Sequence, residues 1–168
     1  MTAAGTVPLP AAKDVRDMLT GLVGKPVNVT PGAPVTPTAD RPVAVAVYVD
    51  PNMSVNALAL MDLGASAYTG GALALLPPGG CQDAVEEDGE LTGMQLEALH
   101  EVVNVLSALF NTEGAPHSKL HKLYAPGEEV PGDLAGMLSA FNRVDLAIEV
   151  PTRAVLRVAP ADALATQG

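Results

Sequence analysis

The residues best suited to chemistry lie on one predicted helix, residues 93–111. On one side, helical spacing predicts a buried stripe of Leu99, Val102, Val103, Leu106, Leu109 and Phe110. On another side, spacings of four, three and four define what we call the polar ridge: Glu97, Glu101, Asn104 and Ala108. Asn favours caps and turns over helix interiors, so Asn104 needs an explanation. Its amide offers donors and an acceptor without charge. The alternative interpretation is a solvated polar face.

The sequence from 96 to 109, LEALHEVVNVLSAL, resembles the signature helix of the CheC/CheX chemotaxis phosphatase family. That family has an acidic residue or Ser, then Glu-x-x-Asn, then small residues one turn later, and a Pro further downstream. The matching residues here are Glu97, the pair Glu101 and Asn104, the small residues Ser107 and Ala108, and Pro126. The flanking order of strands and helices also agrees, so the resemblance extends over residues 13–160.

The resemblance implies hydrolysis of the aspartyl phosphate of a CheY-like response regulator. The regulator supplies its own Mg²⁺, so no cofactor of this chain is expected. Glu101 would pair with the regulator's active-site Lys, and Asn104 would orient the attacking water. Phosphoryl transfer depends mainly on positioning and electrostatics, and an amide adds no negative charge beside phosphate. By the same resemblance, Glu97, Ser107, Ala108 and Pro126 would contact the partner.

Two other features of the family bear on the partner. The single Glu-x-x-Asn motif indicates the CheX type, which forms homodimers. The same fold also serves as a non-catalytic interaction or scaffold domain in flagellar-switch relatives, and this is the alternative function. Both Glu101 and Asn104 are present, which favours catalysis because a docking surface has no special need for the amide.

A metal site is the third alternative. Glu97 and His100 match the Glu-x-x-His of di-iron bundles, but such sites need two copies and further Glu residues. His117 and His121 are four apart, a spacing that suits a metal only on a helix. Residues 118–122 instead predict an exposed strand, so no metal site is expected.

The elements that must position the polar ridge indicate an α/β (α+β) fold with two layers, a largely antiparallel sheet packed with helices. The predicted helices are 13–23, 63–76, 93–111 and 131–142; the predicted strands are 26–30, 43–49, 54–62, 117–124, 144–150 and 154–158. Strands 43–49 and 54–62 predict one hairpin, and the last two strands predict another. Residues 43–49 alternate Val with Ala and Tyr, which predicts burial on both faces.

Three glycines and one polar pair predict how one of these helices packs and where another begins. Gly64, Gly70 and Gly71 each cost about 1 kcal/mol relative to Ala inside a helix, which predicts either close packing against a neighbour or a helix with other boundaries. Thr92 and Gln95 have the spacing of a capping box, which predicts where the long helix begins.

Length and composition bound the remaining possibilities. The chain has 168 residues and predicts one domain, 13–160, with a disordered segment 1–12 and a tail 161–168. Its net charge of −10 disfavours nucleic acid and anionic membranes as partners. No secretion signal or apolar run long enough for a bilayer is present, which predicts a cytoplasmic protein. Pro residues between 31 and 42 predict an extended linker, and residues 82–90 predict an acidic loop.

Overall fold

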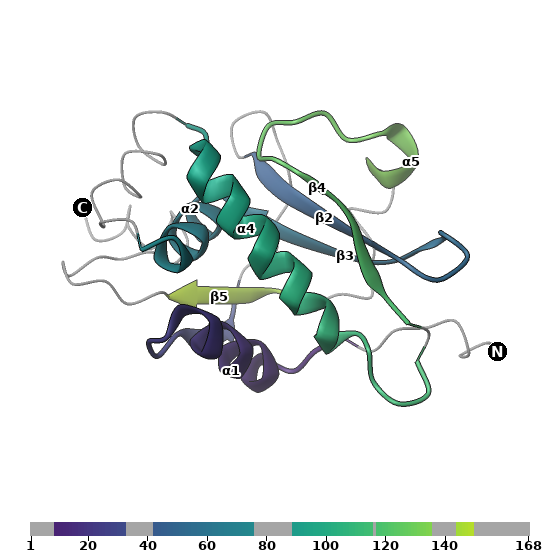
Figure 1. Cartoon of the computed structure of the whole chain (residues 1–168), viewed down its shortest axis with the longest axis horizontal. Helices are drawn as coiled ribbons and strands as arrows, with labels where there is room; N and C mark the ends of the chain where they lie inside the picture. Colours follow the sequence, from purple (N-terminus) through teal and green to yellow (C-terminus); the bar gives the residue numbers. More distant parts are fainter. Residues whose placement is uncertain (1–8, 33–41, 76–88, 116, 136–143, 150–168) are drawn as a thin grey trace.

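The computed structural model describes residues 9–32, 42–75, 89–115, 117–135 and 144–149. The elements are α1 (Ala12–Val23), β1 (Asn28–Pro31), β2 (Val43–Val49), β3 (Val55–Asp62), α2 (Leu63–Leu73), α4 (Gly93–Leu106), the 3₁₀ turn η3 (Ser107–Leu109), β4 (Lys119–Tyr124), α5 (Gly132–Ala135) and β5 (Leu146–Glu149). Helices are combined with antiparallel sheets, so the predicted α+β class is confirmed (Figure 1).

Strand β2 is the middle strand of a three-stranded sheet with the order β3-β2-β4, and both pairings are antiparallel. The predicted hairpin of β2 and β3 is present. At its turn the carboxylate of Asp50 accepts hydrogen bonds from the backbone N–H groups of Asn52 and Ser54, at 2.9 and 3.0 Å. A short polar side chain thus satisfies the turn's backbone donors and closes the hairpin.

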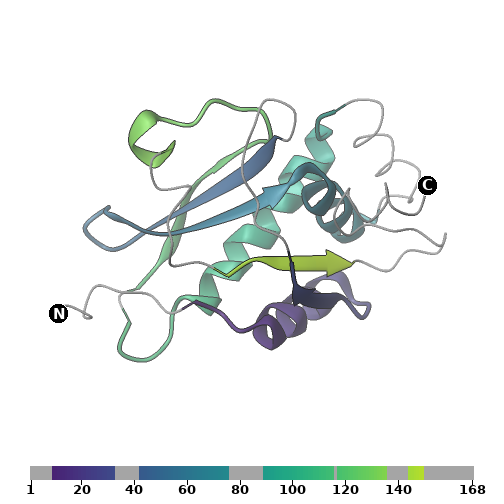
Figure 2. The same cartoon turned by 180° about the vertical axis from the view of Figure 1, so that it is seen from behind.

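All seven residues of β2 are buried, as their alternation predicts. Ala44, Ala46 and Tyr48 face the core formed with α4, whereas the four Val residues face a second core that includes Leu134 of α5. Figure 2 shows the sheet from the side opposite to α4. The central strand is therefore covered on both faces and provides a fixed support for α4.

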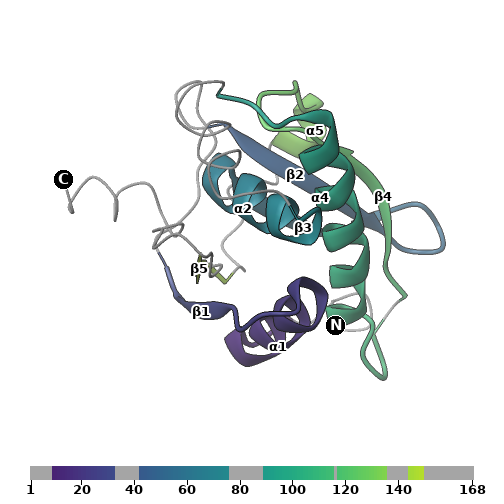
Figure 3. The same ribbon diagram turned by 60° about the vertical axis from the view of Figure 1, so that its left-hand side comes forward.

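Helix α2 contacts α4 at Gly70. A Cβ atom added to Gly70 would lie 2.6 Å from the backbone oxygen of Gln95 and 3.4 Å from the backbone nitrogen of Leu99. The close packing predicted from the glycines of this helix is thus confirmed at Gly70. Figure 3 shows the two helices side by side.

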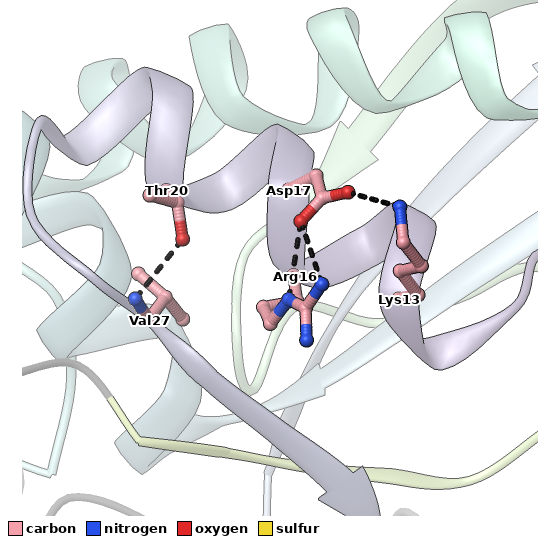
Figure 4. A network of polar contacts seen from close by, with 5 residues as sticks. All are labelled: Lys13, Arg16, Asp17, Thr20 and Val27. Carbon is pink, nitrogen blue, oxygen red and sulfur yellow. Dashed lines mark hydrogen bonds and ion pairs between the residues drawn. The ribbon is translucent and has the colours of Figure 1, made fainter.

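Helix α1 and the two-stranded sheet of β1 and β5 form the other side of the molecule (Figure 3). Gly24 ends α1 with a φ of 79°, a conformation that Gly adopts without a steric penalty. The hydroxyl of Thr20 then accepts a hydrogen bond of 3.0 Å from the N–H of Val27 (Figure 4). This contact holds the start of β1 against α1.

Several predictions fall wholly or partly outside the described residues. They involve residues 1–8, 33–41, 76–88, 136–143 and 150–168, which include most of the predicted linker and acidic loop and the second strand of the closing hairpin. The first strand of that hairpin is present as β5, and its partner in the structure is β1. In the part of the chain that is described, no helix has the length and apolar character needed to cross a membrane.

Candidate functional site

The polar ridge lies on α4, whose beginning is fixed by the predicted capping box. The Thr92 hydroxyl accepts from the N–H of Gln95 at 3.1 Å, and the Gln95 side-chain oxygen accepts from the N–H of Thr92 at 2.9 Å. At the other end the helix tightens: α-helical geometry stops at Leu106, and η3 follows. The sequence predicted one continuous helix to residue 111, because the apolar spacing continues through the 3₁₀ turn.

Helix α4 is buried on two sides. Leu99 and Val103 pack against the β2 sheet, and Val102 packs against α1 and the sheet of β1 and β5. At about 100° per residue, the members of the polar ridge point about 180° away from the centre of this buried surface. Glu97, Glu101, Asn104 and Ala108 are accordingly all exposed. The ridge is thus the side of α4 that faces away from the core.

The side chains of Glu101 and Asn104 make no hydrogen bond or ion pair with any other described residue. Three positions apart on a helix, their Cβ atoms are neighbours at about 5–6 Å. The backbone beneath them is fixed by the packing of Val102 and Val103, which are 0% and 1% exposed. A carboxylate and an amide are therefore presented together on a rigid support, with their polar atoms available to an external molecule.

The other predicted site residues are placed differently. Glu97 lies one turn before Glu101 on the same ridge. Ser107 is half-buried, and its hydroxyl donates a 2.7 Å hydrogen bond to the backbone oxygen of Asn104. Pro126 is half-buried in a turn after β4. Strand β4 itself runs back along α4, towards the beginning of that helix (Figures 1 and 3). The structure therefore brings Ser107 to Asn104, whereas Pro126 lies on a different element, the turn after β4.

Sequence reasoning missed two residues that hold the end of α4. Tyr48, fully buried on β2, donates a 2.6 Å hydrogen bond to the backbone oxygen of Val103. Asn111 donates to the backbone oxygens of Ser107 and Ser118, at 3.1 and 2.9 Å, and accepts from the N–H of Ser118 at 2.6 Å. The signal for Tyr48 was its size, because it follows Ala44 and Ala46 on the same face of the strand. Asn111 gave no comparable signal.

The residues considered for a metal do not assemble into one group. His100 is exposed on α4 one residue before Glu101, and His121 is exposed on β4 rather than on a helix. Within the described ranges, there is no group of three or more His, Cys, Asp and Glu residues that could hold a metal ion.

Comparison of the chain with protein-family models, with curated proteins and with solved structures finds no match. A functional interpretation therefore depends on the geometry of α4 and on the resemblance of its sequence.

Proposed function

We propose that this protein is a CheC/CheX-like phosphatase that hydrolyses the aspartyl phosphate of a phosphorylated CheY-like response regulator. The observation that carries the proposal is the joint exposure of Glu101 and Asn104, free of partners among the described residues, on a helix whose opposite side is buried. Such a helix can enter the active site of another protein without refolding. The resemblance of residues 96–109 to the family's signature helix supports the same function.

In the proposed mechanism the Glu101 carboxylate pairs with the ammonium group of the regulator's active-site Lys and fixes the position of α4. The Asn104 side-chain oxygen accepts a hydrogen bond from a water molecule and holds that water in line with the scissile phosphorus–oxygen bond. The water oxygen bonds to phosphorus as the bond to the Asp carboxylate breaks, yielding inorganic phosphate and the free carboxylate. The regulator's Mg²⁺ balances the phosphoryl charge, and this chain contributes positioning.

The test is the rate at which a receiver domain loses its phosphate, measured with wild type and with two substitutions at position 104. Asn104→Ala removes the water-orienting amide, and Asn104→Asp keeps its size but adds negative charge beside phosphate. We expect both substitutions to reduce the accelerated rate by about a hundredfold or more, because the loss of a correctly positioned group costs a rate factor of this size. Binding of the phosphorylated receiver by Asn104→Ala should remain close to wild type.

Glu101→Gln separates anchoring from catalysis. It keeps a hydrogen-bonding group but removes the charge that pairs with Lys, so it should weaken receiver binding as well as the rate. Asn28→Ala is the matched control, since Asn28 is an exposed Asn on β1 outside α4. If Asn104→Ala and Asn28→Ala both retain the wild-type rate, the catalytic proposal is wrong and a docking function of the polar ridge takes its place.

The proposed substrate is a cytoplasmic signalling protein, so we propose the same compartment for this chain. We also propose a homodimer by analogy with the CheX type. Sedimentation at several protein concentrations tests this directly.

A further inference from the structure

The end of α4 departs from regular geometry beside Asn104. In a continuing α-helix the N–H of Ser107 would donate to the backbone oxygen of Val103, four residues back. In this structure the N–H of Ser107 is directed to the backbone oxygens of Asn104 and Val105, three and two residues back, and η3 begins. The backbone oxygen of Val103 is not among these acceptors, and Val103 is only 1% exposed.

The phenol of Tyr48 takes up this oxygen. Its hydroxyl donates to the Val103 oxygen at 2.6 Å, across the core between β2 and α4. The Tyr48 ring is itself fixed by the ring of Phe110, with centroids 5.0 Å apart and planes inclined by 59°. A buried carbonyl without a partner is costly, so the Tyr48 hydroxyl allows the helix to tighten at this point.

A second hydrogen bond acts on the other side of Asn104. The backbone oxygen of Asn104 accepts from the Ser107 hydroxyl at 2.7 Å as well as from the Ser107 N–H. The backbone carbonyls of Val103 and Asn104 lie on either side of the Asn104 Cα atom. Each therefore accepts a hydrogen bond from a side-chain hydroxyl, which a regular α-helix does not contain. They fix the direction of the Cα–Cβ bond and hence of the amide.

We propose that Tyr48 is a positioning residue for Asn104, acting through the Val103 carbonyl together with Ser107. The inference depends on the proposed phosphatase function for its catalytic consequence, but not for its structural one. Without the Tyr48 hydroxyl, the Ser107 N–H returns to the Val103 oxygen, the 3₁₀ turn relaxes, and Asn104 rotates with it. A displacement of about 1 Å at a catalytic group can cost about a hundredfold in rate.

The test is Tyr48→Phe, which removes one oxygen and keeps the ring that packs on Phe110. With a phosphorylated receiver domain as substrate, we expect kcat to fall between about tenfold and a hundredfold while KM stays near wild type. Tyr124→Phe is the matched control, because Tyr124 packs in the core on the far side of the sheet. Val45→Ala, also in that far core, controls for a general loss of stability and should retain kcat.

A nuclear magnetic resonance measurement tests the structural part without activity. In Tyr48→Phe the ¹³C resonance of the Val103 carbonyl and the side-chain amide resonances of Asn104 should both shift, and in Tyr124→Phe neither should. In wild type the Tyr48 hydroxyl proton should exchange slowly with solvent. This last observation needs no variant, so it stands even if Tyr48→Phe does not fold.

The outcomes separate the two proposals. If wild type accelerates receiver dephosphorylation and Tyr48→Phe does so equally, the positioning role is overturned. It is also overturned if the Asn104 resonances do not move, or if the wild-type hydroxyl proton exchanges freely. If wild type is inactive on every receiver while Tyr48→Phe shifts Asn104, the phosphatase function is wrong and the structural coupling stands.

Discussion

Replacing Gly70 with Ala should destabilise the protein, although Ala is the better helix former. The helix-propensity gain is about 1 kcal/mol. Against it, the new Cβ would lie 2.6 Å from the backbone oxygen of Gln95, so α2 and α4 must move apart by several tenths of an ångström. Overpacking of this kind costs about 1–3 kcal/mol, and the upper end applies because the contact is with backbone that the capping box holds in place. We expect a net loss of about 2 kcal/mol in the free energy of unfolding, from these two opposing terms.

Gly21→Ala is the matched comparison, because Gly21 lies within α1 and an added Cβ would have nothing within 4 Å. It should raise the free energy of unfolding by about 0.4–1 kcal/mol. Urea unfolding followed by circular dichroism measures both changes, and a 2 kcal/mol loss corresponds to a Tm about 4–8 °C lower. Equal stabilisation by both substitutions would show that the two helices adjust without cost, and the argument from Gly70 would fail.

Two further predictions concern the elements that hold α4. Thr92→Ala removes the capping hydroxyl and should lower the free energy of unfolding by about 1 kcal/mol, whereas Thr112→Ala, in an exposed turn, should stay within about 0.5 kcal/mol of wild type. Burial raises the pKa of the Tyr48 phenol, so above about pH 10 the unfolded chain loses this proton while the folded protein keeps it. The free energy of unfolding should then fall by up to about 1.4 kcal/mol per pH unit from this group. Tyr48→Phe should lack this component in urea unfolding across the alkaline range, and identical pH profiles would contradict it.

The parts of the fold that were predictable from sequence are those set by local chemistry. The Val alternation of residues 43–49 predicts a strand buried on both faces because side-chain direction alternates whatever the neighbours are. Asp50 and Thr92 mark a turn and a helix start, since their side chains bond to backbone a few residues away. Each of these features needs only a short window of sequence.

Features that depend on distant partners were not predictable in this way. Strand 28–31 pairs with 146–149, and alternation indicates the face of a strand but not its partner. The bond from Tyr48 to Val103 ends on a backbone oxygen, which every residue has, so no side-chain pattern marks it. The 3₁₀ end of α4 was missed for a related reason: Leu109 and Phe110 keep their apolar spacing through it.

The structure also changes the argument for Asn104. In the middle of a long helix, Asn104 would lower helix stability. In the structure α4 ends at Leu106, and the backbone oxygen of Asn104 already accepts hydrogen bonds from Ser107, the first residue of the 3₁₀ turn. The free-energy cost of Asn is small at such a position, because Asn is tolerated where helices end. Its residue type alone is therefore weak evidence for function. Stronger evidence is that two hydrogen bonds fix the backbone on both sides of an amide that makes no bond of its own to the described residues. A merely solvated side chain has no need of such support, whereas a group that must orient a water molecule does.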